Sequence, residues 1–352
     1  MNGTLSELAV QAVEWPRLLE VLSHHAQSAM GVARCRVLPL WNELVSVSLR
    51  QQETTEMVAL LEGNDPTPAL SFPDIREQLI RSQKGGVLEA GELRDCAIVL
   101  ALMAEVERYA AARRDQIQAL VRIVEPLQVT KSLQGVLKAI EGAIQSDGSM
   151  KDTASVELRR LTHHAMELKH EMRQKLEHIL HSRKYEEVLQ ESYFAQREGR
   201  YVVPVKADMR GRIPGIVHDI SASGATVFLE PRELVELNNS IKVADLAVER
   251  EVQRILRELT GLLASRADAI GQGIEVLAEW DVIRAKAELS RRLKCGPVSL
   301  NEQGRIMLKR ARHPLLLLAK EDVLANDIHM DETVRVLVIS GPNTGGKTVT
   351  LK

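Results

Sequence analysis

The residues with the clearest chemical pattern are Gly341–Thr348, which read GPNTGGKT and fit the phosphate-loop pattern G-x-x-x-x-G-K-[ST]. Glycines let backbone N–H groups turn towards an anion, and the helix expected after Lys347 directs its positive end at the same place. In such a loop Lys347 reaches the β- and γ-phosphates of a nucleotide, and the Thr348 hydroxyl ligates Mg²⁺. The predicted nucleotide-binding residues are Gly341, Pro342, Asn343, Thr344, Gly345, Gly346, Lys347 and Thr348.

The residues around this loop have the order that a phosphate loop requires. Residues 334–339 (VRVLVI) read as a buried parallel strand, and TVTLK begins a helix. A buried parallel strand needs neighbouring strands on both sides, and few of them are found in this sequence. We therefore predict that residues 1–352 alone neither bind ATP tightly nor hydrolyse it. A calorimetric titration that shows micromolar ATP binding would contradict this prediction.

A second candidate site lies in residues 197–231, where the sequence has the period of β-structure. Strands are predicted over 201–207, 215–221 and 225–230, joined by the turns DMRGR and SASG. Its basic side chains are Arg197, Arg200, Lys206, Arg210 and Arg212, and Glu198 and Asp208 are the acids that lie among them in residues 197–212. Such a patch could neutralise nucleic-acid phosphates. Solvated turn charges are the alternative interpretation.

Two long amphipathic runs flank this segment and would position it. Residues 151–196 and 232–293 are predicted as lever helices, with runs of about 40 residues, or roughly 60 Å of helix. Each has one narrow apolar stripe, so the two are expected to pair as antiparallel arms, with the small sheet at their far tip. Residues 1–150 are predicted to form a helical core. Residues 294–352, which include the short predicted strand 297–301, begin an α/β ATPase domain.

Composition excludes several classes of protein. The formal net charge of −2 excludes a global basic field, so any nucleic-acid surface must be local. Three widely spaced cysteines give neither a disulfide framework nor a metal site. The sequence shows no signal peptide and no apolar run long enough to span a membrane, so we expect a cytoplasmic protein without a membrane partner. The clustered histidines read as a solvated helix face, and no catalytic residue is assigned.

Four segments together resemble the second bacterial branch of the MutS family. They are RYVVPVKADMRGRIPGIVHDISASGATVFLEP, VELNN, RHPLL and GPNTGGKTVTLK, in that order from residue 200 onward, and the resemblance itself begins near Leu18. It implies a homodimeric ATPase that uses ATP and Mg²⁺. It also implies a mainly α, multidomain fold: a helical core, a lever of long helices, a β-rich clamp at residues 197–231 and a P-loop domain. By position, Val323 and Leu324, within the segment 323–326, flank the adenine.

The same resemblance leaves three functions open. The first is a clamp on branched DNA that suppresses recombination, with endonuclease activity in a C-terminal Smr domain. The second is an ATPase that acts on stalled or collided ribosomes through rRNA. The third is a non-catalytic coiled-coil interaction protein. The branch lacks the mismatch-reading domain, and the family's magnesium-holding acids and dimer signature are missing here, so the sequence is expected to be the front part of a longer, enzymatic chain.

Overall fold

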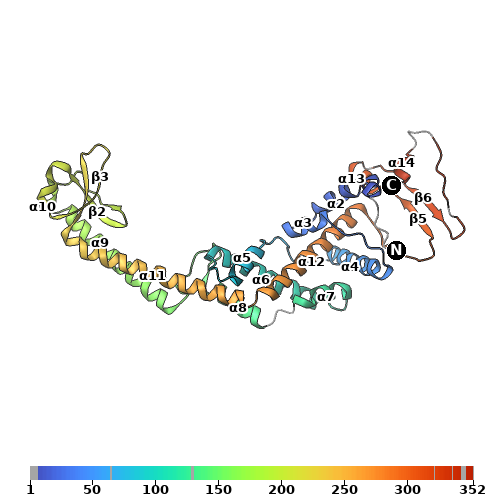
Figure 1. Cartoon of the computed structure of the whole chain (residues 1–352), viewed down its shortest axis with the longest axis horizontal. Coiled ribbons are helices and arrows are strands. Elements are labelled where there is room, and N and C mark those ends of the chain that lie inside the picture. Colours follow the sequence, from blue (N-terminus) through green and yellow to red (C-terminus); the bar gives the residue numbers. More distant parts are fainter. Residues whose placement is uncertain are drawn as a thin grey trace. The chain divides into compact units, whose positions relative to one another are not determined.

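The computed structural model describes residues 7–63, 66–127, 131–320, 322–334, 336–341 and 346–351. The chain is mainly helical, as predicted, and its strands form small antiparallel sheets (Figure 1). It divides into two compact units. Unit 1 contains residues 1–84, 95–137 and 263–352, and unit 2 contains residues 85–94 and 138–262.

Unit 1 is a helical core built around α12 (Ala267–Leu293). This helix is buried on nearly every side and includes the fully buried Trp280, Leu277 and Ile283. The other helices of the core are α1 (Glu7–Ala12), α2 (Trp15–Ser23), α3 (Ala29–Arg36), α4 (Leu44–Glu62), α5 (Arg76–Gln83), α7 (Gln118–Val124) and the 3₁₀ turn η1 (Glu125–Leu127). Two further helices, α6 (Ala90–Ala111) and α8 (Lys131–Ala143), have residues in both units.

One buried carboxylate, Asp281 of α12, fixes the start of α3. Its oxygens accept hydrogen bonds from the backbone N–H of Gln27 at 3.0 Å, the N–H of Ser28 at 2.8 Å and the Ser28 hydroxyl at 2.7 Å. The Ser28 hydroxyl in turn accepts from the Gly31 N–H at 2.9 Å and so caps α3. A Cβ at Gly31 would lie 2.1 Å from Asp281 Oδ2, so this close approach requires glycine.

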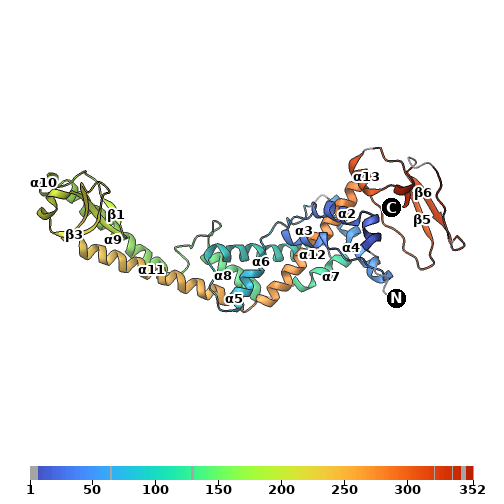
Figure 2. The same cartoon turned by 45° about the horizontal axis from the view of Figure 1, so that its top comes forward.

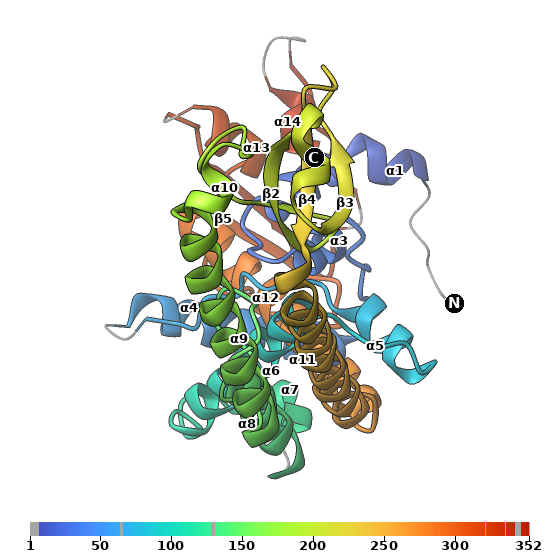
Figure 3. The same cartoon turned by 90° about the vertical axis from the view of Figure 1, so that its left-hand side faces the viewer.

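Unit 2 contains two long helices, α9 (Val156–Leu180) and α11 (Arg232–Ala264), which run side by side (Figure 3). The Lys169 ammonium lies 2.7 Å from Asp245, and the Ser155 hydroxyl donates to Glu251 at 2.7 Å. Lys169 comes after Ser155 in the chain, whereas its partner Asp245 comes before Glu251, so α9 and α11 run antiparallel. Hydrogen bonds from Arg254 and then Ser155 hold the pKa of Glu251 at about 2, so this carboxylate is charged at neutral pH.

A four-stranded antiparallel sheet packs against one end of this pair. Its strands are β1 (Ala195–Arg197), β2 (Arg200–Lys206), β3 (Gly215–Ile220) and β4 (Thr226–Pro231), in the order β1-β2-β4-β3. The three predicted strands are all present, and β1 is an addition that a two-residue turn at Glu198 and Gly199 joins to β2. One buried cluster contains Met172 and Ile179 of α9, Val203 of β2 and Leu234 of α11. The sheet therefore lies beyond the end of α9 and the start of α11, which Figures 1 and 2 also show.

The prediction of two continuous runs of about 40 residues is wrong in both places. The α9 helix ends at Leu180 and is followed by the single turn α10 (Arg183–Glu186). Val188 and Leu189 are then buried in the sheet, where Lys206 N–H donates to the Val188 carbonyl at 3.0 Å. This packing needs extended chain and so ends the helix. The second run breaks at residues 265–266, and α12 beyond the break packs within unit 1.

Pro204 shows how β2 accommodates a residue without an N–H. Its carbonyl accepts from Gln190 N–H at 2.9 Å, on the side of β2 away from β4. In an antiparallel strand the N–H and C=O of one residue point to the same side, so the missing donor faces the short segment at Gln190 and not the β4 ladder. The proline therefore costs no hydrogen bond to β4.

A buried carboxylate, Glu230 of β4, ties the sheet to α11. It is fully buried and lies 2.8 Å from Arg200 Nη1, 2.7 Å from Asn238 Nδ2 and 2.6 Å from His218 Nε2. Asn238 of α11 also donates to the Tyr201 carbonyl and accepts from the Tyr201 N–H. Every polar group of Glu230 and Asn238 that is withdrawn from water therefore has a partner within the sheet or at the start of α11.

Replacing Glu230 with glutamine is expected to destabilise unit 2 by about 1–3 kcal/mol, because it removes the charge and turns one buried acceptor into a donor. Urea denaturation followed by circular dichroism measures the change. The matched control is Asp219→Asn, which weakens an ion pair to Arg197 whose side chains are 39% and 47% exposed. That change should cost less than about 1 kcal/mol. Equal losses in the two variants would contradict a special role for Glu230.

The last part of unit 1 contains a two-stranded ribbon of β5 (Ile306–Ala311) and β6 (Asn326–Met330), with α13 (Pro314–Ala319) between the strands and α14 (Lys347–Leu351) after them. The strands predicted over 297–301 and 334–339 are not formed by the described residues of those ranges. Val336 is 75% exposed and Val338 is 82% exposed. Since a parallel strand forms only against a neighbour, these residues remain outside any ladder in the described chain.

None of the described helices combines sufficient length with sufficient hydrophobicity to cross a lipid bilayer.

Candidate nucleotide-binding site

The described part of the predicted phosphate loop comprises Gly341, Gly346, Lys347 and Thr348, while Pro342, Asn343, Thr344 and Gly345 lie outside the described residues. Gly346 has φ +78° and Gly341 has φ +147°, backbone conformations that glycine adopts without strain. Lys347 and Thr348 begin α14, and the Lys347 ammonium donates to the carbonyl of Gly341. The Lys347 side chain thus contacts the first glycine of the motif.

These residues fit a bound nucleoside triphosphate in their donor chemistry. The Lys347 ammonium and the Thr348 hydroxyl, on the first two residues of α14, are the phosphate donor and the magnesium ligand that the pattern requires. A Cβ at Gly346 would meet no atom within 4 Å, so its positive φ, and not crowding, is the reason for glycine there. Both glycines of the G-x-x-x-x-G-K-[ST] pattern, Gly341 and Gly346, are thus explained by the described backbone.

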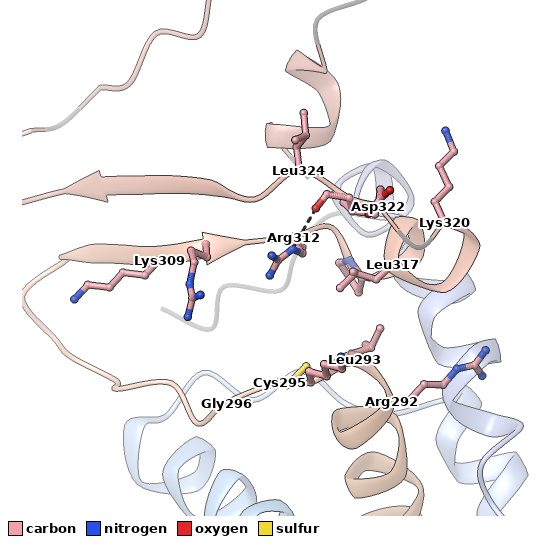
Figure 4. A pocket seen from close by; sticks show the side chains of 14 residues that line it. Arg292, Leu293, Cys295, Gly296, Lys309, Arg312, Leu317, Lys320, Asp322 and Leu324 are labelled. Carbon is pink, nitrogen blue, oxygen red and sulfur yellow. Dashed lines mark hydrogen bonds between the residues drawn. The ribbon is translucent and has the colours of Figure 1, made fainter.

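A pocket of about 870 Å³ lies within unit 1 near α13 (Figure 4). It is lined by the last turn of α12, by β5, by α13 and by the linker before β6, and it includes Val323 and Leu324, the two residues predicted to flank adenine. Leu324 is 90% exposed and, with Leu317 and Pro314, provides apolar surface.

The rest of the lining is strongly basic. Its charged residues are Arg292, Lys294, Lys309, Arg310, Arg312 and Lys320, with Asp322 as the one acid among them. The Arg312 guanidinium donates to the Val323 carbonyl at 3.2 Å, and Figure 4 shows it between Cys295 and the 322–324 segment. These basic residues were not predicted to form a site, although the dense runs RRLK and LKRARH signal them in the sequence.

Two of the basic residues have unusual backbone conformations. Lys294, after the end of α12, has φ +53°, and Arg310, at the irregularity of β5, has φ +51°. The described chain contains four non-glycine residues with positive φ, and these two line the same pocket. Side chains with a Cβ are disfavoured there by roughly 1–2 kcal/mol.

The five basic residues predicted at the sheet are mostly engaged within unit 2. Arg197 pairs with Asp219 and stacks 4.2 Å from the Phe228 ring centre, and Arg200 pairs with Glu230. The Lys206 ammonium donates to the Glu187 carbonyl at 3.0 Å. Arg212 lies 3.7 Å from Glu187 and is 64% exposed, and Arg210 is exposed on the 3₁₀ turn η2 (Ala207–Arg212) without an ion pair to any described residue. The charge that faces solvent is therefore concentrated at Arg210 and Arg212.

Alanine at both Arg210 and Arg212 is expected to weaken nucleic-acid binding by the full-length protein about tenfold or more and to lower the salt slope by about two. Fluorescence anisotropy on a four-way DNA junction at several salt concentrations measures both. The matched control is Arg250→Ala with Arg257→Ala, which removes two exposed arginines from α11. An equal loss in both double variants would show that η2 is not a preferred contact.

Other reactive groups form no second site among the described residues. No three His, Cys, Asp or Glu side chains of the described ranges converge as metal ligands would. Cys35 and Cys96 are buried free thiols, and Cys295 is an exposed one. Burial raises the pKa of Cys35 to about 12, which keeps it a thiol at neutral pH.

Comparison with known proteins gives consistent relatives. No protein-family model matches the chain. It is 36% identical over 343 residues to a protein named Endonuclease MutS2 from Geobacillus sp. (strain WCH70), which covers 97% of this chain and 44% of that protein. Proteins of the same name from Geobacillus thermodenitrificans and Pelotomaculum thermopropionicum are 34% and 36% identical over 348 residues, with 99% of this chain and 44% of each relative covered.

The chain thus spans less than half the length of these curated relatives. The similarity nevertheless extends over 97–99% of this chain. We conclude that the chain belongs to the MutS2 family.

Proposed function

We propose that this chain is part of a MutS-type ATPase that works as a homodimer and binds branched DNA, such as recombination intermediates, with an outcome that suppresses recombination. The observation that carries the proposal is the similarity, over 97% of the chain, to proteins named Endonuclease MutS2, together with a phosphate-loop motif at Gly341–Thr348. The endonuclease activity named for the relatives is assigned to the whole protein. No residue among 1–352 is assigned a role in strand cleavage.

In the proposed site the nucleotide is ATP and its metal is Mg²⁺. Backbone N–H groups of the loop and the Lys347 ammonium would hold the phosphates, and Thr348 would hold the metal through its hydroxyl. The metal, when bound, neutralises charge that develops on the transferred phosphoryl group. Val323 and Leu324 would contact the adenine, since both line the pocket that contains the apolar surface of α13.

The proposed DNA contact is the β-sheet of unit 2, through Arg210 and Arg212. The sheet packs on α9 and α11 through one buried hydrophobic cluster, so a movement of these helices would carry the sheet with it. The α11 helix comes directly before α12 in the chain, with only the break at residues 265–266 between them, so a nucleotide-dependent change at α12 would have a short path along the chain to α11.

The test uses the full-length protein. We expect ATP turnover that a four-way DNA junction stimulates, and junction binding that is at least about tenfold tighter than binding to a linear duplex at matched salt. Ribosome co-sedimentation is measured in parallel under the same salt conditions. Binding to ribosomes without junction preference would overturn the DNA assignment in favour of a ribosomal substrate, and absence of ATP turnover would overturn the ATPase assignment.

A further inference from the structure

One face of α9 carries a line of arginine and histidine side chains that the proposed function does not use. Residues three and four apart lie on the same face of a helix, and this line follows that spacing. Its members, all of them exposed, are Arg159, His163, Met166, His170, Arg173, Glu177 and the C-cap residue His181. At about 100° of turn per residue they lie within about 40° of one direction, whereas the buried residues of α9 are centred about 120° away. We call this line the α9 stripe.

Most of the acidic residues of α9 lie outside the stripe. Three of its four glutamates belong to the other part of the exposed surface of the helix. There Glu157 pairs with Arg160 at 2.6 Å, and Glu171 pairs with Lys175 at 2.8 Å. Glu177 is the one acid within the stripe. The charges of α9 are therefore separated, with neutralised ion pairs on one side of the helix and an excess of basic groups on the other.

The basic side chains of the stripe have few partners within the protein. Neither of its two arginines forms an ion pair with a residue of the described ranges. His163 lies 3.4 Å from the Glu167 carboxylate, and His170 lies 3.1 Å from the Gln174 side-chain amide. The charged groups that α10 and α11 place beside α9 are Arg183, Lys184, Glu186, Glu233, Asp245, Glu251 and Arg254. In the part of the chain that the structure describes, none of them forms an ion pair with a stripe residue.

The length and composition of the stripe select its partner. From Arg159 to His181 the stripe extends about 33 Å at about 1.5 Å per residue, close to one turn of duplex DNA at about 34–36 Å. A row of cations of that length is complementary to the phosphates, which follow one another regularly along a duplex. Single-stranded nucleic acid is bound largely on aromatic side chains, and α9 contains none. A lipid surface or an apolar peptide would need more apolar area than Met166 alone provides.

We propose that the α9 stripe binds the phosphate backbone of duplex DNA, and that this contact strengthens as the solution becomes more acidic. Histidine is the residue type that ordinarily gains its charge between about pH 8 and pH 5. Protonation of the three stripe histidines would change the stripe from two cations against one acid to five cations against one acid. The inference rests on the proposed DNA contact of unit 2, to which it adds a second surface, and not on junction preference or ATP turnover.

The first measurement is fluorescence anisotropy of the full-length protein on a linear DNA duplex, at several salt concentrations and at about pH 7.5 and about pH 6. We expect the salt slope to be steeper by about two at the lower pH, because each phosphate contact contributes about 0.9 to it. The triple variant His163→Gln, His170→Gln and His181→Gln should lose at least about half of this increase. The matched control is His164→Gln with His178→Gln, which changes two exposed histidines of α9 outside the stripe and should keep the increase.

The second measurement changes the fixed charges of the stripe. Arg159→Gln with Arg173→Gln should weaken duplex binding about tenfold or more at both pH values, because two phosphate contacts are lost. Arg160→Gln with Lys175→Gln changes the net charge equally on the other side of the same helix and should bind within about twofold of the unchanged protein. Glu177→Gln should tighten binding about two- to threefold, since it removes the one acid of the stripe. All these side chains are exposed, so the melting temperature should change little.

Several outcomes overturn the inference. A pH response that is equal in the triple variant and in the unchanged protein removes the histidines from the contact. Equal losses in the two double variants would indicate a general effect of net charge, and a Glu177→Gln protein that binds no tighter would remove the stripe as a contact. Tighter binding of a duplex RNA of the same sequence would assign the stripe to RNA. Absence of duplex binding by the unchanged protein would overturn the proposed DNA function as well, whereas duplex binding without the expected pH response overturns this inference alone.

Discussion

Replacing Lys347 with alanine is expected to lower the ATP turnover of the full-length protein by at least about a hundredfold. The ammonium group is the one full positive charge among the described residues of the loop, and it donates to the carbonyl of Gly341. A preorganised donor aimed at developing phosphoryl charge contributes about 2.7–4 kcal/mol, which corresponds to 10²–10³ in rate. Steady-state phosphate release at saturating ATP measures the loss.

The same variant should keep its structure, because Lys347 is only half-buried and lies on a five-residue helix. Far-ultraviolet circular dichroism and the melting temperature provide this control. The matched control is Lys84→Ala, which removes an exposed lysine outside the phosphate loop and should leave turnover unchanged. If turnover survives in Lys347→Ala, the assignment of the phosphate loop is wrong.

Replacing Asp281 with alanine is expected to lower the free energy of unfolding of unit 1 by about 3–5 kcal/mol. The change leaves three donors without an acceptor, namely the N–H groups of Gln27 and Ser28 and the Ser28 hydroxyl. A hydrogen bond to a charged acceptor contributes about 1.5–3 kcal/mol, and several such bonds made by one group are not additive. Urea denaturation of the 352-residue chain measures the loss, with a midpoint well below that of the unchanged chain.

Two companions separate this contact from a general effect on α12. Gly31→Ala should also destabilise unit 1, because its Cβ would lie 2.1 Å from Asp281 Oδ2 and would push the carboxylate out of position. Asp268→Ala changes an exposed carboxylate in the first turn of the same helix, which Gln83 contacts at 3.0 Å, and should cost less than about 1 kcal/mol. Equal losses at Asp281 and Asp268 would contradict the account of the α3 cap.

Local patterns in the sequence were sufficient to predict the sheet of unit 2. Alternating apolar residues and short turns gave strands over 201–207, 215–221 and 225–230, close to the observed β2, β3 and β4. The pattern predicts these strands because both faces and both turns are encoded within about 30 residues. Strand β1 was not predicted, because its three residues, which pair with β2, are too few to show the periodicity of a strand.

The errors fall where tertiary contacts decide the structure. Helical periodicity continues past Leu180, yet Tyr185, Val188 and Leu189 are buried in the core of the sheet. Their burial outweighs helix propensity, which differs by only a few tenths of a kcal/mol between ordinary residues. The strand predicted over 334–339 is a similar case, because its apolar residues specify a buried strand only where neighbours supply the ladder.

The candidate site also has one part that the sequence predicts and one part that it does not. The pattern of glycines, lysine and threonine at residues 341–348 can be recognised from order alone, because every group acts within one turn of chain. The basic pocket could not be recognised in advance, since it joins residues 292–296, 309–314 and 317–324 across three elements. Its two strained residues are visible only in the backbone, since no residue type at Lys294 or Arg310 signals a positive φ.

The outer strand of the sheet, β3, has a consequence for the behaviour of the protein in concentrated solution. It pairs only with β4 and presents Ile216, Val217 and Ile220 at 44–53% exposure, a combination that invites other chains to add strands and grow into fibrils. Its register with β4 shifts between Val217 and Asp219, around His218, so a straight second strand could match only half of the edge at a time. This irregular register and the neighbouring Asp219 carboxylate therefore disfavour the addition of further strands at the β3 edge.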